Sequence, residues 1–412
     1  LPLRTSLPLC KRYLCRRCAP HRRHRLEALV AVREGAIGRG ACVSAPLLEV
    51  EGLTRHFVAR RSAFGRPTAT VKAVDGIDLT VPAGSTLALV GETGCGKSTV
   101  GRLVLRLIEP MAGSIKFAGR DILAFGEKEL RAFRREAQIV FQDPYSSLNP
   151  RMTVEELIGE PLGLHDIVPA SRRRDRVAQL LGLVGLDARY GRRYPHEFSG
   201  GQRQRIAIAR ALAVEPKLIV CDEPVSALDV SIRSQVLNLL SDLRKRLSLT
   251  YIFISHDLSV VKHIADRVAV MYLGRIVESA AAEELFANPR HPYTRALFSA
   301  IPVPQPNAQR QRQLLEGDVP SPLSPPAGCH LHPRCAYAID RCRIERPALV
   351  DDHEAHATAC HRWRELPALV GESGQDAPTP QLQALMAKFT RPTDVRAAGG
   401  VDTLKVEGSR PS

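Results

Sequence analysis

GETGCGKST, at positions 91–99, is the stretch that decides the fold. It fits the pattern G-x-x-x-x-G-K-[ST], in which glycines let backbone N–H groups surround a phosphate without Cβ clashes. The run STLALV (85–90) predicts a strand before it, and VGRLVLRLI (100–108) has the apolar spacing of a helix after it. A phosphate loop requires this order of strand, glycine-rich loop and helix, so the sequence predicts a nucleoside triphosphate site.

The side chains of this loop have distinct expected roles. Lys97 is expected to bridge the β- and γ-phosphates, and the Ser98 hydroxyl to ligate Mg²⁺. The loop residues expected to contact the nucleotide are Gly91, Gly94, Cys95, Gly96, Lys97, Ser98 and Thr99.

An acidic pair ends a second apolar strand pattern, KLIVCD (217–222). Asp222 is expected to hold Mg²⁺ directly or through water, because a parallel sheet presents its ligands at the carboxyl ends of its strands. Its neighbour Glu223 points elsewhere and is placed to polarise an attacking water. The alternative is a solvated acidic pair that only caps a strand.

Two further polar residues follow strand patterns. Gln142 in IVFQDP is expected to reach the metal or the water, and His256 in FISHD is expected to contact the γ-phosphate. Taken alone, each is an ordinary polar residue at the end of a strand. Five motifs in one order favour the functional interpretation.

The stretch FSGGQRQR (198–205) holds a second pair of glycines, directly before the helical run IAIARAL (206–212). Free backbone N–H groups at the start of a helix favour an anion. Since the chain already has a complete phosphate loop, this raises the question of what the second anion-facing loop binds.

The phosphate loop, the Gln142 loop, SGGQ, CDEP, SALD (226–229) and SHD, in this order, resemble the ATP-binding subunit of an ABC transporter over roughly residues 47–285. The resemblance implies a P-loop NTPase (RecA-like) α/β core with a helical ABC subdomain at about 125–215. It also implies that the second loop binds ATP seated on a partner subunit, so that two subunits enclose two nucleotides. The residues of this contact would be Ser199, Gly200, Gly201 and Gln202.

The same resemblance makes Glu223 the general base and His256 the switch histidine, and it places Asp229 in a loop that crosses the dimer interface. Phe57 is the expected adenine-stacking aromatic. Phe64 is the alternative, because ARRSAFGRPTAT lengthens that loop. The signature begins with Phe198 where many family members have Leu, a tolerable apolar change.

The C-terminal stretches HPYTRALFSAIP (291–302) and LEGDVPSPLSPPAGCHLHPRC (315–335) are similar to the end of ATP-binding subunits of oligopeptide and dipeptide importers, in particular the second of their paired ATPases. This implies ATP-driven peptide uptake at the cytoplasmic face of the bacterial inner membrane. The implied partners are a sister ATPase, two transmembrane permease subunits and an external substrate-binding protein. A permease helix is expected to dock near residues 145–149.

Two alternatives stay open at this point. The same importer class could carry nickel, glutathione or a sugar, since the ATPase never touches cargo. A soluble ABC ATPase acting on ribosomes or nucleic acid is the other, with the basic N-terminus as its arm. Such proteins usually carry two nucleotide units in one chain, and no internal repeat is found here.

Four cysteines near the C-terminus have the spacing C-x5-C-x6-C-x17-C: Cys329, Cys335, Cys342 and Cys360. No C-x2-C pair occurs among them, so an ordinary zinc knuckle is a weak interpretation. Four thiolates could hold a [4Fe–4S] cluster, which importers with a similar quartet suggest. Zinc and reduced thiols remain the alternatives.

The charge of the chain, +15 over 412 residues, lies mainly in its first segment. Residues 1–45 carry ten Lys or Arg against two Glu, and we expect them to be disordered or to precede the true start. The expected domains are an ABC unit (46–285) and a cysteine-bearing extension (286–365), followed by a flexible tail (366–412). No apolar run is long enough to span a bilayer, and the ten cysteines favour a reducing compartment.

Overall fold

The computed structural model describes residues 46–61, 67–300, 315–352 and 355–367. The basic segment, most of the expected tail and Phe64 lie outside these residues. No helix of the described residues is long and apolar enough to cross a membrane.

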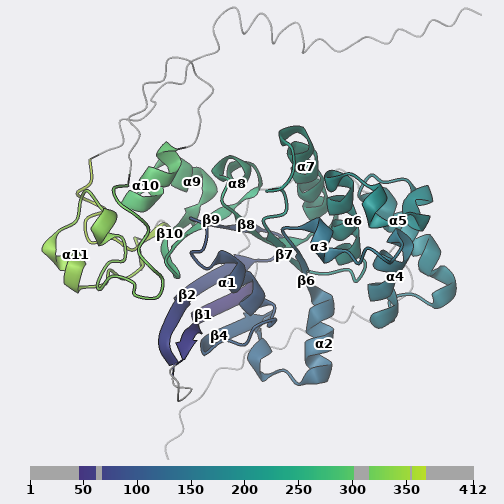
Figure 1. The fold of residues 1–412 in the computed structure, drawn as a ribbon, viewed down its shortest axis with the longest axis horizontal. Helices are drawn as coiled ribbons and strands as arrows, with labels where there is room; N and C mark the ends of the chain where they lie inside the picture. The colour runs from purple at the N-terminus through teal and green to yellow at the C-terminus, as the bar shows by residue number, and fades with distance from the viewer. Residues whose placement is uncertain (1–45, 62–66, 301–314, 353–354, 368–412) are drawn as a thin grey trace, which may run out of the picture. The chain divides into compact units, whose positions relative to one another are not determined.

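The main sheet has eight strands in the order β11-β12-β10-β9-β3-β8-β7-β6 (Figure 1). The five strands from β9 to β6 run parallel, so their carboxyl ends meet at one edge. The strands are β3 (Thr86–Val90), β6 (Ala137–Val140), β7 (Leu218–Asp222), β8 (Thr250–Ser255), β9 (Arg267–Tyr272), β10 (Arg275–Ala281), β11 (Val350–Asp351) and β12 (Ala357–Thr358).

A smaller antiparallel sheet lies beside it, in the order β2-β1-β4-β5. Its strands are β1 (Pro46–Arg61), β2 (Pro67–Pro82), β4 (Ala112–Phe117) and β5 (Arg120–Asp121). Helix α1 (Lys97–Val104) lies between the two sheets, and Val100 and Leu103 pack into the core that both share (Figure 1). The predicted strand–loop–helix order around the phosphate loop is therefore present, although the helix begins at Lys97 and not at residue 100.

The alternating sides of β8 show how the main sheet is covered on both faces. Ile252 and Ile254 belong to the core that contains α1, while Tyr251 and Phe253 belong to a second core with α7 (Val230–Leu247). All six β8 residues are buried, as expected for a central parallel strand. The remaining helices near this sheet are α8 (Leu258–Ile264) and α9 (Ala282–Ala287).

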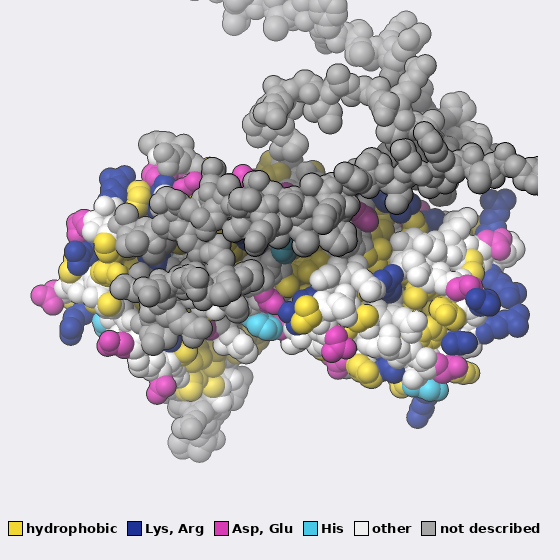
Figure 2. Space-filling model, turned by 90° about the horizontal axis from the view of Figure 1, so that it is seen from above, with side chains coloured by type: hydrophobic (Ala, Val, Ile, Leu, Met, Phe, Trp, Pro, Cys, Tyr) yellow, Lys and Arg dark blue, Asp and Glu magenta, His cyan; other side chains and the backbone are white. Residues whose placement is uncertain are grey.

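The segment expected to be mostly helical, 125–215, contains one strand of the main sheet, β6, and a group of packed helices. Its helices are α2 (Glu127–Glu136), α3 (Pro144–Ser147), α4 (Val154–Leu164), α5 (Arg173–Leu183) and α6 (Gly200–Leu212), with short 3₁₀ turns at Ala170–Arg172, Ala188–Arg192 and Pro195–Glu197. On the face in Figure 2, basic and acidic side chains are interspersed, with Lys and Arg densest at the end formed by α4 and α5.

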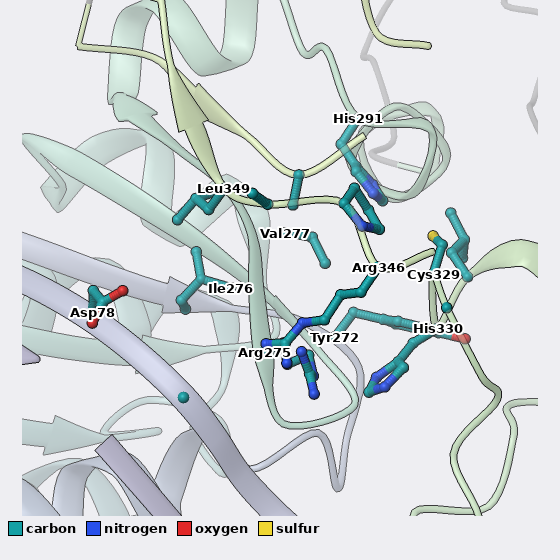
Figure 3. Close-up of a pocket in the computed structure, with 16 residues that line it drawn as sticks. Asp78, Tyr272, Arg275, Ile276, Val277, His291, Cys329, His330, Arg346 and Leu349 are labelled. Carbon is teal, nitrogen blue, oxygen red and sulfur yellow. The ribbon is translucent and has the colours of Figure 1, made fainter. Parts of the chain in front are cut away.

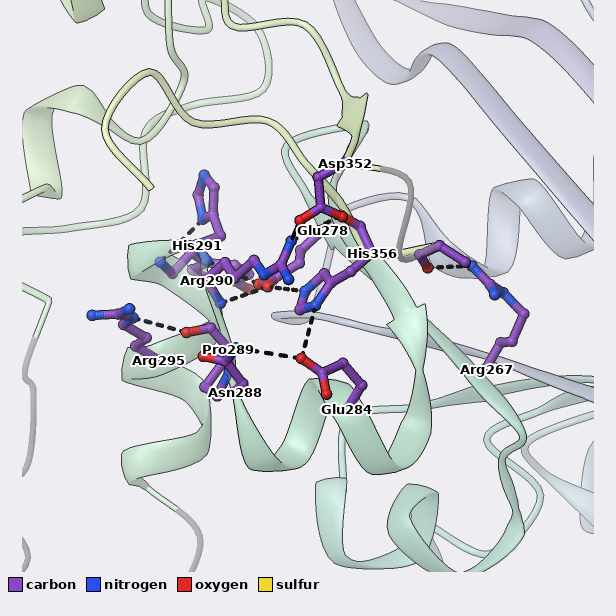
Figure 4. A network of polar contacts seen from close by, with 12 residues as sticks. Arg267, Glu278, Glu284, Asn288, Pro289, Arg290, His291, Arg295, Asp352 and His356 are labelled. Atoms are coloured by element: carbon purple, nitrogen blue, oxygen red, sulfur yellow. Dashed lines mark hydrogen bonds and ion pairs between the residues drawn. The ribbon is translucent and has the colours of Figure 1, made fainter. Parts of the chain in front are cut away.

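The cysteine-bearing extension is joined to the main sheet. Its helices are α10 (Pro292–Ser299) and α11 (Asp340–Ile344), with a 3₁₀ turn at His332–Arg334. Strand β12 pairs antiparallel with β10, and buried Glu278 of β10 accepts bonds from the backbone N–H groups of Arg290 (2.6 Å) and His291 (3.1 Å). His356 Nε2 lies 2.7 Å from the same carboxylate, which closes a buried polar network (Figure 4). The extension thus shares a strand pairing and a buried polar network with the main sheet, and it packs as part of the same core.

Candidate functional site

The phosphate loop occupies the turn between β3 and α1, and its glycines are required by close backbone contacts. A Cβ on Gly91 would lie 2.1 Å from the Met271 carbonyl oxygen, and one on Gly96 would lie 2.0 Å from that of Ala73. Both residues have positive φ, 151° and 109°, which L side chains rarely adopt. The loop can therefore keep this conformation only with glycine at both positions.

Lys97 and Ser98 lie where the motif predicts. Lys97 is 4% exposed, and its Nζ donates to the carbonyl oxygens of Gly91 (2.8 Å) and Glu92 (2.9 Å). Ser98 Oγ donates to Asp222 Oδ1 across 2.7 Å. A hydroxyl and a carboxylate oxygen at this separation are donors that suit Mg²⁺, which prefers hard oxygen ligands.

Asp222 is the last residue of β7 and is buried. Burial raises the pKa of its carboxyl above 3.8, while the Ser98 hydrogen bond and Arg102 act in the opposite direction. An ionised carboxylate held in this position lacks full solvation. A cation bound beside it would therefore stabilise the ionised form.

Glu223 breaks away from the strand. It has a left-handed φ of 48°, uncommon for a residue other than glycine and typical of functional turns. Its Oε2 accepts from Gln142 Nε2 (2.9 Å), and its Oε1 lies 3.2 Å from His256 Nδ1. Three predicted residues thus meet here, because β6, β7 and β8 are adjacent and end at the same edge of the sheet.

The predicted adenine-stacking residue lies in β1. Phe57 is half-buried, and the Arg55 guanidinium lies 5.0 Å from the centre of its ring. One ring face is therefore engaged by a cation, and a base could stack only on the other face or by displacing Arg55.

The second glycine loop starts α6 through a capping box. Ser199 Oγ accepts from the Gln202 backbone N–H (3.4 Å), and Gln202 Oε1 accepts from that of Ser199 (3.1 Å). Gly201 packs tightly, because a Cβ there would lie 2.3 Å from Ile232 Cγ2. Gly200 has more room, with Leu228 at 3.4 Å. The small size of Gly201 is thus explained within this chain alone.

The predicted interface loop ends at Asp229, immediately before α7. Asp229 is exposed, and Val230 beside it has 76% of its surface exposed. Tyr145, in the expected permease-docking stretch, is 62% exposed, and the Arg203 guanidinium lies 3.9 Å from its ring centre. Apolar side chains are thus left uncovered at both places.

The four C-terminal cysteines line one small cavity: Cys329, Cys335, Cys342 and Cys360. All are free thiols, and burial raises the pKa of Cys329 to about 11 and that of Cys360 to about 12. Within the described part of the chain, however, no three or more His, Cys, Asp or Glu side chains are arranged so that they could hold a metal ion. The predicted metal centre is therefore not confirmed.

A larger cavity, of about 440 Å³, is lined by residues of both the extension and the core. Arg275, Arg346 and His330 gather on one side of it, and Cys329 is its only predicted site residue (Figure 3). It is distinct from the phosphate loop.

Sequence reasoning missed two residues that touch the phosphate loop from the extension. The Glu92 backbone N–H donates to the Tyr293 hydroxyl (2.9 Å), and Arg334 Nη1 lies 3.3 Å from Glu92 Oε2. Both residues lie in C-terminal stretches whose similarity to importers was noted. Nothing in those stretches indicated a contact with residue 92.

Two family models match the chain. The ABC transporter model matches residues 74–226, and the model described as oligopeptide/dipeptide transporter, C-terminal region, matches residues 277–342. The first covers the phosphate loop and the acidic pair. The second covers most of β10, the whole of α10 and three of the four cysteines.

Curated relatives align over most of their length. A probable peptide ABC transporter ATP-binding protein of Sinorhizobium fredii, y4tS, is 53% identical over 319 residues, which cover 77% of this chain and 90% of the relative. A putative oligopeptide transport ATP-binding protein of Bacillus subtilis, YkfD, is 51% identical over 322 residues, covering 77% and 96%.

Solved structures share the core. CbiO1 of Clostridium perfringens, part of the ABC transporter complex cbiONQ, has a TM-score of 0.51 and 30% identity and covers 59% of this chain and 91% of its own. The ATP-binding cassette MJ0796, bound to ADP and Pi, has a TM-score of 0.50 and 26% identity and covers 57% and 98%.

Proposed function

This chain belongs to the ABC transporter family of ATP-binding proteins, and we propose that it hydrolyses ATP to energise uptake of di- and oligopeptides through a pair of membrane permeases. One observation carries the proposal. A complete phosphate loop with its acidic pair stands in the same chain as the C-terminal region of oligopeptide and dipeptide transporters. Relatives at about half identity that are named as peptide transport ATP-binding proteins support the cargo class.

Different residues around the phosphate loop would bind the phosphates and the Mg²⁺ ion of the nucleotide. The loop amides hold the phosphates, and Lys97 turns from the Gly91 and Glu92 carbonyl oxygens towards the β- and γ-phosphates. Ser98 and Asp222 are the side chains that would hold Mg²⁺, and Gln142 is a further candidate ligand. A Mg²⁺ ion held there would neutralise negative charge on the phosphates.

Glu223 takes the proton from the attacking water. Its carboxylate already lies between an amide and an imidazole, which fix its direction. His256, 51% exposed, is free of the core and can contact a γ-phosphate at the open side of the site. The three side chains form one unit whose members orient each other.

A second subunit completes the site. Ser199, Gly200, Gly201 and Gln202 form the start of α6. The capping box engages the N–H groups of Ser199 and Gln202, so those of Gly200 and Gly201 suit an anion held by another chain. Exposed Asp229 and Val230 lie on the surface that the second subunit would cover. The implied assembly is a heterodimer with a sister ATPase, bound to two permeases at the cytoplasmic face of the membrane and served by an external substrate-binding protein.

The four thiols are the second part of the proposal. We propose that they hold a [4Fe–4S] cluster, with zinc or reduced thiols as the alternative outcomes of a test. All four side chains line one cavity, which supports this, although they are not arranged as a metal site among the described residues and a cluster would have to draw them together. No step of ATP hydrolysis passes through this centre.

Co-purification tests the function. The tagged Glu223→Gln chain is expressed in its native host, membranes are solubilised in mild detergent with Mg-ATP, and bound proteins are identified by mass spectrometry. Two polytopic permeases and a sister ATPase are expected, and a parallel sample without ATP should retain less of the sister subunit. Ribosomal proteins or nucleic acid in their place would overturn the proposal. Uptake of labelled dipeptide, nickel, glutathione or sugar by the reconstituted complex then identifies the cargo.

A further inference from the structure

Tyr293 reaches the phosphate loop from α10. Its hydroxyl accepts the Glu92 backbone N–H across 2.9 Å, and the side chain is fully buried. Burial raises the pKa of this hydroxyl, so it stays neutral. Its backbone is fixed in turn, because His291 Nδ1 accepts the Tyr293 N–H (3.1 Å) and burial lowers the pKa of His291 to about 4.

Arg334 reaches the same loop residue from the cysteine-bearing turn. Its Nη1 lies 3.3 Å from Glu92 Oε2 and 3.5 Å from the Tyr272 hydroxyl, and its side chain is 9% exposed. The Tyr272 and Tyr293 rings lie 4.6 Å apart between their centres. The two contacts on Glu92 therefore come from neighbouring side chains of one packed group.

The backbone on either side of the Glu92 N–H also holds Lys97. Lys97 Nζ donates to the Glu92 carbonyl oxygen and to the Gly91 carbonyl oxygen just before it. A shift of Glu92 would move both acceptors, and with them the resting position of the lysine that must meet the phosphates. A displaced Lys97 would contact the phosphates less well, so we expect nucleotide to bind more weakly.

We propose that Tyr293 and Arg334 are positioning residues of the ATP site, which hold the start of the phosphate loop from the C-terminal extension. This rests on the proposed ATPase function. Neither residue touches nucleotide; both act through Glu92. The extension is then a part of the catalytic unit as well as a feature of the importer branch.

Tyr293→Phe tests the first contact, because it removes one oxygen and keeps the ring. The KM for ATP of the assembled transporter should rise about five- to tenfold, the effect of leaving one buried donor unpaired, with kcat within about twofold. The matched control is Tyr251→Phe. That buried hydroxyl donates to the Leu240 carbonyl oxygen of α7 and not to the loop, so this variant should lower stability without raising KM.

Arg334→Met tests the second contact. It should raise KM in the same direction, Arg334→Lys should restore part of the loss, and Arg341→Met should leave KM unchanged because Arg341 pairs with exposed Glu345. If Arg334 acts through Glu92, the effects of Arg334→Met and Glu92→Gln on KM will not add.

The outcomes separate this inference from the proposed function. Wild-type complex that neither binds nor hydrolyses ATP would refute the function itself. A wild type that turns over ATP, together with a Tyr293→Phe variant of unchanged KM and reduced melting temperature, would mean that Tyr293 serves packing alone and would overturn the inference. Additive effects of Arg334→Met and Glu92→Gln would overturn the part played by Arg334.

Discussion

Glu223 Oε1 and His256 Nδ1 lie 3.2 Å apart, although the two residues follow different strands. The contact exists because β7 and β8 are neighbours in the sheet and end at the same edge. Gln142 completes the group from β6, on the other side of β7. The candidate general base is thus oriented before any nucleotide arrives.

Glu223→Gln should lower kcat by about 10²- to 10⁴-fold, the usual range for loss of a general base, and leave ATP affinity nearly unchanged. The amide keeps the shape of the carboxylate but cannot take a proton. Steady-state ATPase assays and size-exclusion chromatography with Mg-ATP would measure this. The variant should elute with its partner ATPase as a closed dimer, and normal turnover would rule out Glu223 as the base.

His256→Ala should reduce kcat and couple to Glu223. Because the two side chains are in contact, the double variant with Glu223→Gln should be little slower than the slower single variant. The control is His263→Ala. His263 is exposed and lies at the far end of α8 from His256, so this variant should keep normal ATPase activity. Multiplicative losses in the double variant would show that the residues act independently.

Asp222→Asn should raise the melting temperature of the nucleotide-free chain and weaken Mg²⁺. Burial raises the pKa of the Asp222 carboxyl in the folded chain above its value in the unfolded chain. The protonated carboxyl therefore stabilises the fold at pH values below the unfolded-state pKa, and this stabilisation is lost as the pH rises through the folded-state pKa. At neutral pH the charge therefore destabilises the chain, and the variant's advantage should shrink as the pH falls. The apparent Mg²⁺ affinity in ATP turnover should drop by about 10- to 100-fold. Equal melting temperatures of the variant and the unchanged chain, from neutral pH down to the ordinary pKa of a carboxyl, would contradict a raised pKa for Asp222.

Gly200→Asp should block ATP turnover at the partner's phosphate loop in the assembled complex, while nucleotide binding to the chain's own phosphate loop persists. A carboxylate at the start of α6 would repel a phosphate held by the partner subunit. Gly201→Asp is a poorer test, because its Cβ meets Ile232 and the variant would unpack α6 from α7. Normal turnover with Gly200→Asp would remove this loop from the ATP site.

Anaerobic purification of the full chain, followed by metal and sulfide analysis, tests the cysteine centre. A [4Fe–4S] cluster predicts about four iron and four sulfide per chain, lost in a Cys342→Ser variant. One zinc per chain, or four thiols that react freely after mild unfolding, would each reject the cluster. Cys221→Ser is the control, since Cys221 lies in β7, away from the quartet.

Local patterns predicted much of this site. The spacing of Lys97, Ser98 and the glycines determines the loop, and the ends of three apolar strands placed Gln142, Asp222, Glu223 and His256 at one edge. The contact between Glu92 and Tyr293 could not be predicted, because no pattern in a single sequence relates residues 201 positions apart. The residues that would contact Gly200 and Asp229 cannot be predicted from this chain, because in the proposed assembly they belong to the second subunit.

The number of residues between Glu92 and Tyr293 also determines how long the phosphate loop exists during translation before Tyr293 is made. Translation at about 5–20 residues per second needs roughly 10–40 s to cross the 201 positions between them. During that interval the nascent phosphate loop is complete in sequence but lacks its contact with Tyr293, so the proposed role of Tyr293 implies weaker ATP binding until the extension has left the ribosome. A chain that ended before Tyr293 would keep the whole phosphate loop and would be expected to bind ATP less tightly than the full chain.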